Sequence, residues 1–408
     1  MPSSYQLLLG GKPADQDLVT LLVSIDVEES MDLPAAIQLS LPLSRSTDGD
    51  FTYINDARLA PMANVAVVAI PAVDNAVLMP DCTVSAVSGA FGGSSPAVQC
   101  IFDGYVLSQK IHLETGATKS LLTVWGQDAC WLMNTAEQVR EWINQTDADV
   151  AATIFGEYGI TPSDQNSADD SPSPNNSMPG TSPSHPEDGH SLMQRGSDIQ
   201  FLRMLARRNG RLCRVACIDK PGQRIGYFAK PSLKGTPGVT ISLNDPQNWT
   251  VNTFDLDWDA TRPTAVVARQ ALFTDAVPAG VSADTSDSGL TLLGARGLAD
   301  FTGQPMTVLL TAPVDDAGEL NLRAQSVLRD ADWFVRCEGE ADAERLGAVL
   351  RAGMLVWLDG IGAVHSGTYL VWSVRHRITQ QAHTMKFTLV RNAVGEAPSS
   401  SGGAVGFA

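Results

Sequence analysis

The sequence predicts a mainly β protein of the α+β class, in which two β-barrels are joined by a small mixed α/β region. Short segments of alternating polar and apolar residues, bounded by glycine and polar turns, fill the first and last thirds of the chain. Between them, two segments carry apolar residues at helix spacing, separated by a stretch rich in serine, proline and aspartate. With 408 residues, the chain is long enough for two to four domains with cores of their own.

Residues 1–127 are predicted to form the first barrel. The expected strands are short, alternate in polarity and are separated by turn residues, which is typical of an all-β unit. They lie at residues 18–27, 36–43, 65–70, 99–106 with a continuation through 104–111, and 119–125.

Residues 128–252 are predicted to form the helical and α/β region. Their composition predicts helices at 129–144 and 149–158. Residues 161–191 are of low complexity and bury too little apolar surface to offset the entropy cost of ordering them, so we predict a disordered loop there.

A further helix is expected at 197–208. Ser197 suits the N-cap position, Asp198 suits the positive end of the helix dipole, and Gly210 suits the C′ position. The apolar stripe of this helix consists of Ile199, Leu202, Leu205 and Ala206, widened by Phe201. A hairpin should follow, with strands at 211–218 and 224–228.

Residues 253–395 are predicted to form the second barrel, with residues 396–408 as a flexible tail. The alternative for this tail is a peptide that docks on a neighbouring subunit. Strands are expected at 253–259 and 264–269, followed by a polar loop at 275–288. One helix face then holds Leu320, Ala324, Val327, Leu328 and Ala331.

A β-meander closes this second barrel, with strands at 333–340, 355–358, 369–378 and 383–391. Alternation predicts that Leu370, Trp372, Val374 and Ile378 share one face. In the last strand, Met385, Phe387 and Leu389 should point inward, and Thr384, Lys386 and Thr388 outward.

Two motifs resemble a known family. The string G-x-G-x-x-x-S-G-x-Y-x-V-x-x-V-x-H is followed by F-T-L-x-R-N, and its positions are Gly360, Gly362, Ser366, Gly367, Tyr369, Val371, Val374 and His376. The second motif, QRGSDIQFLRMLARRNGRLCRV at 194–215, is preceded by IFGEYGI. In order and spacing, the chain from about Gly104 onward resembles the phage late control protein D family. These are the baseplate hub proteins of contractile tails and extracellular contractile injection systems, related to the N-terminal part of VgrG, the type VI secretion spike.

The resemblance implies a structural role, without catalysis. Both barrels are expected to be similar to a tail-tube subunit, and three chains are expected to form a ring between a hexameric inner tube and a trimeric spike. The implied partners are the chain itself as a homotrimer, the inner tube protein above, the spike protein below and other baseplate proteins. The alternative hypotheses are a baseplate-associated cell-wall hydrolase and a carbohydrate-binding β-protein.

Charge argues against nucleic acid or an anionic membrane as partner, because 45 acidic residues outnumber 28 basic ones and the net charge is −17. The acidity fits a solvated surface, and the alternative is an acidic inner wall of a channel. No stretch approaches the roughly 18 apolar residues of a membrane span, and no secretory signal is visible. We therefore expect synthesis in the cytoplasm, and the resemblance implies a bacterial cell and incorporation into a phage tail or contractile injection particle.

The sequence assigns no catalytic, cofactor-binding or metal-binding residue. A nucleophile elbow, an H-E-x-x-H helix and a phosphate-binding loop are all missing, and the glycine-rich segment 89–95 is predicted to be a flexible turn. His185, Glu187, Asp188 and His190 lie together in the polar loop, but nothing rigid fixes their geometry, so a solvated linker is preferred to a metal site. His376 falls on an apolar face, where a structural histidine is expected.

Two further clusters are expected to be structural. Arg203, Arg207 and Arg208 should complement the helix dipole and contact the protein's own carboxylates. Cys213 and Cys217 should share a strand face, without the second pair that a zinc site requires. All six cysteines are expected to be reduced thiols in apolar surroundings: Cys82, Cys100, Cys130, Cys213, Cys217 and Cys337.

Overall fold

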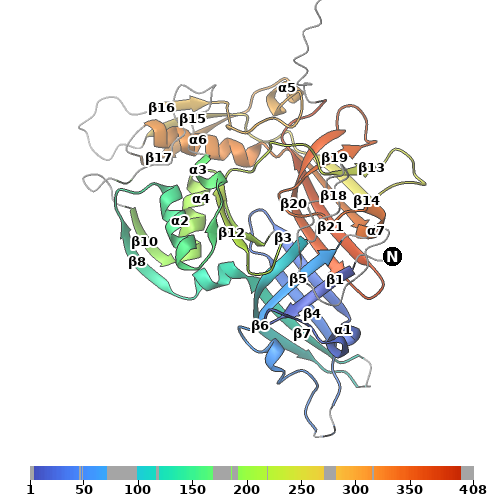
Figure 1. Ribbon diagram of the computed structural model, residues 1–408. Coiled ribbons are helices and arrows are strands. Elements are labelled where there is room, and N and C mark those ends of the chain that lie inside the picture. Colours follow the sequence, from blue (N-terminus) through green and yellow to red (C-terminus); the bar gives the residue numbers. More distant parts are fainter. Residues whose placement is uncertain are drawn as a thin grey trace, which may run out of the picture.

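The computed structural model describes residues 4–45, 47, 49–70, 99–115, 119–168, 185, 192–217, 219–270, 282–314 and 317–396. Within these residues the protein is mainly β, as predicted, and most strands belong to one long sheet. In Figure 1 the N-terminal half of this sheet (blue) and the C-terminal half (red) lie next to each other, and the helical region (green) lies beside them.

The N-terminal half of the long sheet has the strand order β3-β4-β7-β6-β5-β1-β2. A short helix, α1 (Gln16–Leu21), precedes β3, and a 3-10 helix, η1 (Ala57–Leu59), lies between β4 and β5. The strands are β1 (Ser4–Leu9), β2 (Lys12–Pro13), β3 (Ser24–Ser30), β4 (Ala36–Pro42), β5 (Asn64–Ile70), β6 (Gln99–His112) and β7 (Leu121–Asp128).

The C-terminal half has the order β14-β18-β21-β20-β19-β13. A short helix, α7 (Ala343–Leu346), lies between β18 and β19. The strands are β13 (Val239–Ser242), β14 (Thr253–Trp258), β18 (Val335–Asp342), β19 (Leu355–Asp359), β20 (Gly367–Ile378) and β21 (His383–Arg391).

The two halves repeat one strand arrangement. Read from β3 and from β14, the orders β3-β4-β7-β6-β5-β1 and β14-β18-β21-β20-β19-β13 match strand for strand. β6 and β20 also carry a bulge at the same place in their pairing with the following strand, between Val106 and Ser108 and between Val371 and Ser373. One difference remains, because β1 pairs antiparallel with β5 whereas β13 pairs parallel with β19.

The backbone before β5 and β19 repeats as well. Met62 and Gly353 each stand two residues before their strand, with positive φ angles of 66° and 92°. Each donates its N–H to the carbonyl of the valine that precedes the bulge, Val106 or Val371, at 2.8 Å in both halves. The repeat therefore extends to the register of single residues.

The halves are joined edge to edge rather than closed separately. β3 pairs antiparallel with β20 over Ser30–Ser373 to Ile25–Ile378, so that the two sheets become one. Among the described residues the strand path does not return on itself, so two separately closed barrels are not observed. A single hydrophobic core, containing Val27 and Phe102 as well as Val374 and Phe387, runs through both halves.

A buried ion pair lies beside this joint. Arg351 Nε lies 2.9 and 2.8 Å from the two carboxylate oxygens of Glu29, and the Arg351 Nη2 atom also donates to the Cys217 carbonyl at 2.8 Å. The two side chains are 14% and 10% exposed. On the solvent side, Arg375 of β20 reaches Asp26 of β3 at 3.6 Å with 55% of its side chain exposed.

The prediction that Leu370, Trp372, Val374 and Ile378 share one face is wrong, because β20 contains a bulge. Leu370 packs with Val390 and Trp372 in a small cluster outside the main core, whereas Val371, Val374 and Ile378 face the main core. Trp372 is the extra residue, so alternation is interrupted there and Leu370 and Trp372 do not share a face with Val374. The inward positions predicted for β21 are confirmed.

The middle region has a core of its own, formed mainly by α2 (Asp147–Glu157) and α4 (Asp198–Arg208). The helix predicted at 129–144 is wrong. A 3-10 helix, η2 (Ala129–Asn134), is followed there by a strand, because β8 (Glu137–Trp142) pairs with β10 (Leu192–Ser197) from far along the chain. The predicted hairpin is confirmed, and the remaining elements are β9 (Thr161–Pro162), α3 (Gln165–Ala168), β11 (Leu212–Cys217) and β12 (Arg224–Ala229).

A small α/β layer is inserted between β14 and β18. The helix α6 (Ala317–Ala331) covers a three-stranded sheet, and the predicted apolar positions Leu320, Ala324 and Leu328 lie in its core. The strand predicted at 264–269 is present, but it pairs in this layer and not in the long sheet. The layer's strands are β15 (Ala265–Gln270), β16 (Ser282–Thr285) and β17 (Thr307–Ala312), and the short helix α5 (Leu298–Thr302) precedes β17.

The strand predicted at 18–27 is wrong in its first part. α1 occupies residues 16–21 and buries Leu18, and the strand starts only at Ser24. A mixed run of six residues is too short for polarity alone to separate one helical turn from a strand.

The ion pair beside the joint gives a test of its contribution. Arg351→Met leaves the Glu29 carboxylate buried without its partner, and we expect a loss of about 3–5 kcal/mol in the free energy of unfolding measured with urea. Arg375→Met is the matched control, expected to cost at most about 1 kcal/mol because the pair with Asp26 is exposed. Equal losses for the two variants would contradict this account of the joint.

Candidate functional site

The motif at 360–392 is centred on Arg391, at the end of β21. Arg391 is fully buried, and its guanidinium stacks over the Tyr369 ring with 5.3 Å between the Cζ atom and the ring centroid. Its guanidinium donates to four backbone carbonyls: Leu293 at 3.0 Å, His365 and Ser366 at 3.2 Å, and Gly395 at 2.6 Å. Burial lowers the pKa of Arg391.

Two neighbours complete this arrangement. Gly367 has a φ of 144°, and a Cβ there would lie 2.5 Å from Arg391 Nη2. Asn392 accepts the N–H of Leu293 at 2.9 Å and donates to the carbonyl of Thr291 at 3.0 Å. The Gly, Tyr, Arg and Asn of the motif thus tie the loop between β16 and α5 to the C-terminal half, which is a structural role.

His376 and His383 form a buried pair on adjacent strands. The Nδ1 atom of His376 lies 3.1 Å from Nε2 of His383, and the two residues are 0% and 5% exposed. Burial, together with the second imidazole, lowers the pKa of His376 well below its usual value, and burial lowers that of His383 to about 4. The pair is therefore uncharged at neutral pH, as expected for structural histidines.

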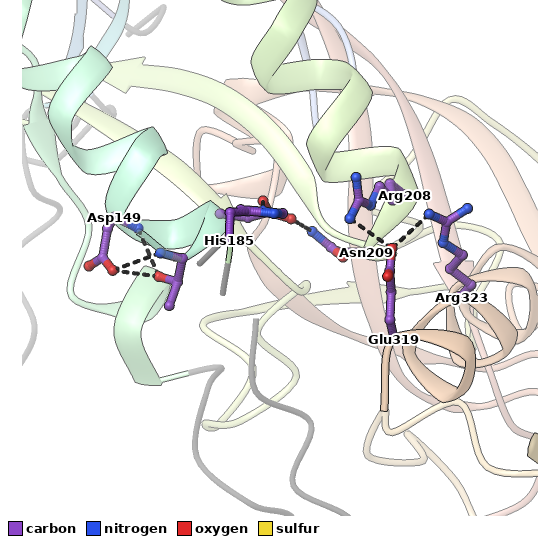
Figure 2. A network of polar contacts seen from close by, with 8 residues as sticks. Asp149, His185, Arg208, Asn209, Glu319 and Arg323 are labelled. Atoms are coloured by element: carbon purple, nitrogen blue, oxygen red, sulfur yellow. Dashed lines mark hydrogen bonds and ion pairs between the residues drawn. The ribbon is translucent and has the colours of Figure 1, made fainter. Parts of the chain in front are cut away.

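A polar network connects the middle region with the inserted layer (Figure 2). Glu319 of α6 accepts from Arg208 at the end of α4 and from Arg323, both at 2.7 Å. Arg329 of α6 donates to the carbonyl of Asn209 at 2.7 Å. The basic cluster thus includes a contact with the protein's own carboxylates, as predicted for Arg208.

Gly210 ends this helix as predicted, with a φ of 61°. A Cβ at this position would lie 2.8 Å from the Cα of Ser326 in α6, so glycine also permits the close approach. Ser197 occupies the N-cap position, but its hydroxyl donates to Asn134 and makes no cap hydrogen bond.

His185 departs from the prediction of a solvated linker. Its Nε2 atom lies 2.7 Å from Oδ1 of the fully buried Asp147, and Asn209 donates to the other carboxylate oxygen (Figure 2). His185 is only 6% exposed. Glu187, Asp188 and His190, the glycine-rich segment 89–95 and the tail from 397 on lie outside the described residues. No group of three potential metal ligands occurs within the described part of the chain.

The cysteine predictions agree with the structure. Cys213 and Cys217 lie on the buried face of β11, and all five cysteines of the described residues are free and buried. Burial raises the pKa of Cys213 to about 12 and that of Cys337 to about 12, so these thiols stay protonated. Cys82 lies outside the described residues.

A cavity of about 370 Å³ lies where the N-terminal half, the hairpin β11–β12 and the segment 351–354 before β19 meet. Asp219 is the one acidic residue among the described residues of its lining, and the Cys217 thiol has a raised pKa, mainly through its hydrogen bond with Cys100. The described residues of this cavity therefore offer neither a carboxylate pair for glycoside hydrolysis nor an activated nucleophile. A second hollow, of about 330 Å³, lies on the open polar face of the long sheet, where Lys386 pairs with Glu340 at 3.5 Å.

No helix in the described part of the chain combines the length and apolar character that crossing a membrane requires.

The Arg391 arrangement predicts different effects for two glycines. Gly367→Ala places a methyl group against the guanidinium, and we expect a loss of about 2–4 kcal/mol in unfolding free energy. Gly362, at a φ of 84° with open space around it, is the matched control. For Gly362→Ala we expect about 1–2 kcal/mol from backbone strain alone. Urea unfolding of both variants measures the difference, and equal costs would contradict the clash.

The histidine pair predicts acid sensitivity. Because the folded-state pKa of His383 is below the unfolded value of 6.5, the unfolded state binds more protons, and stability falls as the pH drops from about 6.5 towards 4. Asp128 and Asp332, whose pKa values burial raises to about 6, act in the opposite sense over that range.

Comparing the unmodified protein with the variant His383→Gln cancels the contributions of Asp128 and Asp332, because both proteins contain these residues. Between pH 7 and pH 4 the unmodified protein should lose about 3 kcal/mol more unfolding free energy than the variant. Urea titrations at four pH values measure this, and parallel stability curves would show that His383 is not held neutral.

Comparison with known proteins identifies the fold. No protein-family model and no curated protein matches the sequence. Among solved structures, the chain is similar to the 43 kDa tail protein of prophage MuSo2 from Shewanella oneidensis, with a TM-score of 0.61 and 15% identity over 96% of this chain and 99% of that one. It is also similar to a tail protein from Neisseria meningitidis MC58, with a TM-score of 0.59 and 13% identity over 96% and 97% of the two chains.

A third similar structure is a chain of the Francisella PdpA–VgrG complex, with a TM-score of 0.51 and 8% identity over 97% of this chain and 53% of that one. At these identities the comparisons establish the fold alone. The resemblance found in the sequence is thus confirmed at that level: this chain has the fold of phage tail proteins.

Proposed function

We propose that this protein is a structural baseplate hub, three copies of which form a ring that adapts a hexameric inner tail tube to a trimeric spike. The observation that carries the proposal is the internal repeat, in which β3-β4-β7-β6-β5-β1 and β14-β18-β21-β20-β19-β13 share strand order and bulge position. The fold of phage tail proteins supports the same assignment.

The physical argument is symmetry matching. A chain with two similar sheet units presents two similar surfaces, so three chains around an axis present six to a hexamer on one side. The same three chains present three-fold symmetry to a trimer on the other side. Because most soluble oligomers close under rotational symmetry, one interface repeated three times suffices to build such a ring.

The units of this proposal follow the predicted domains at 1–127, 128–252 and 253–395, with two exceptions in their strand content. β13 comes from the range assigned to the middle region, and the layer with α6 is an insertion within the range of the second unit. We assign the first and second units to the tube-facing ring, and the middle region to contacts with other baseplate proteins.

The proposed partners are therefore a second and a third copy of this chain, an inner tube protein, a spike protein and other baseplate proteins. The particle is a contractile phage tail or injection system, assembled from a chain made in the bacterial cytoplasm. Among the described residues the cavity beside the hairpin β11–β12 has one acidic residue in its lining, which gives no carboxylate pair for a cell-wall hydrolase there. The second hollow is lined by four carboxylates, Glu28, Asp255, Glu338 and Glu340, so the hydrolase stays the alternative that the experiment below tests.

The oligomeric state tests the proposal. Mass photometry of the purified chain, alone and with its spike protein, should give a species of three times the chain mass, in concentration-dependent equilibrium with the monomer. A species that stays monomeric in both conditions would overturn the proposal. Cell-wall clearing in a zymogram, lost on substitution of a single carboxylate, would support the hydrolase instead.

A further inference from the structure

The joint between β20 and β3 is a template for a second joint. Up to its bulge, β20 pairs with β19, at Leu370 and before. Beyond the bulge, from Ser373 to Ile378, the same edge pairs with β3. The bulge thus marks the point where β20 changes neighbours.

β6 repeats the first half of this pattern and not the second. Up to Tyr105 it pairs with β5. Beyond the bulge, from Ser108 to His112, it pairs with β7 on one side, and the other edge has no strand partner among the described residues. β14, the counterpart of β3, likewise pairs only with β18 in the described part of the chain.

The registers of the two halves align residue by residue. Across the N-terminal half, one row of paired residues runs Ser108, Trp125, Gln38, Asp26. Across the C-terminal half, the matching row runs Ser373, Thr388, Glu338, Asp255. Ser108 therefore corresponds to Ser373, and Asp255 corresponds to Asp26.

Replacing each residue of the β20–β3 pairing by its counterpart in the other half gives a specific register for pairing β6 with β14. Within the chain, Arg375 is opposite Glu28 and Arg377 is opposite Asp26. The corresponding pairs put Lys110 opposite Asp257 and His112 opposite Asp255. On the other face they put Gln109 opposite Trp258, Ile111 opposite Leu256, and Leu113 opposite Phe254.

These two edges are complementary. On the solvent side, Lys110 and His112 would face Asp257 and Asp255, the same basic-to-acidic order as in the joint within the chain. On the core side, Ile111 and Leu113 would meet Leu256 and Phe254, and the remaining pair is Gln109 with Trp258. In the single chain three apolar residues on this face are unusually exposed: Ile111 is 45%, Leu113 55% and Trp258 48% exposed.

The ion pair that flanks the joint within the chain has an apolar counterpart. Met62 corresponds to Gly353 through its hydrogen bond, so Ala60 corresponds to Arg351, and Trp258 corresponds to Glu29. Met62 is itself 45% exposed beside this position. An apolar contact between Trp258 and this segment is thus available where the chain itself uses Glu29 and Arg351.

We propose that β6 beyond its bulge, residues 108–113, pairs antiparallel with β14, residues 254–259, of a second copy of this chain. The pairing is in the register of β20 and β3, with Lys110 opposite Asp257. This inference rests on the proposed ring and names the interface that closes it. Because the two edges differ, the contact is head-to-tail, and three such contacts close the proposed ring when each one rotates the next chain by a third of a turn. The contact also covers two strand edges that would otherwise invite aggregation.

Disulfide trapping tests the register directly. In a full-length parent carrying Cys82→Ser, the double variant Lys110→Cys/Asp257→Cys should give dimers and trimers, and no larger species, on non-reducing gels after mild oxidation. Each single variant should stay monomeric on the gel. The matched pair within the chain, Glu28→Cys/Arg375→Cys, should form its disulfide without any increase in mass.

An out-of-register pair is the sharper control. Ser108→Cys/Asp255→Cys puts both thiols on the solvent side, displaced by four residues or about 13 Å, so it should not cross-link. Charge reversal adds a second measurement. Lys110→Glu and Asp257→Lys should each shift mass photometry towards monomer, and the double reversal should restore the oligomer.

The outcomes separate this inference from the proposed function. A trimer that cross-links through the 110–257 pair, with charge rescue, supports both. A trimer in which this pair fails to cross-link, or in which the 108–255 pair cross-links equally well, overturns the register and leaves the hub proposal standing. A chain that never exceeds the monomer overturns both.

Discussion

The pairing of β3 with β20 is the contact on which the architecture depends. It brings together strands from opposite ends of the chain and converts two six-stranded arrangements into one sheet over one core. A sheet edge with free N–H and C=O groups must find a partner or be protected. This pairing supplies a hydrogen-bonded partner for one edge of each half. The buried Glu29–Arg351 pair lies beside it and adds geometric specificity, since an isolated charge at either position would be costly.

The other parts are held to this sheet by cations with backbone or carboxylate partners. Arg224 of β12 binds both oxygens of Asp103 in β6 at 2.9 and 3.0 Å, which fixes the middle region on the N-terminal half. Arg329 fixes α6 on the end of α4, and Arg391 fixes the loop between β16 and α5 on β21. Each of these arginines is largely buried and bridges segments about 100 residues or more apart, so the four parts of the chain are oriented by a few polar contacts as well as by packing.

The alternation of polar and apolar residues predicts a strand well when one side faces the core and the other faces solvent. In β21, Met385, Phe387 and Leu389 face the core as expected. The prediction fails where tertiary pairing decides, as in β8, whose partner β10 lies some 50 residues away, and at Trp372, where one extra residue reverses the alternation. The motif residues were found from the sequence, but not their role: nothing in the string shows that Arg391 reaches carbonyls at 293, 365 and 395. The burial of His185 cannot be predicted from its local sequence, because the buried Asp147 that binds it lies 38 residues earlier.

The central claim is that one chain imitates two subunits of a six-fold ring. Electron microscopy of the purified oligomer, viewed along its axis, tests this most directly. The account predicts a three-fold ring whose rotational power spectrum has a strong six-fold component, because each chain contributes two lobes of matching strand order. A ring with three lobes only, or with a number of copies other than three, would contradict it.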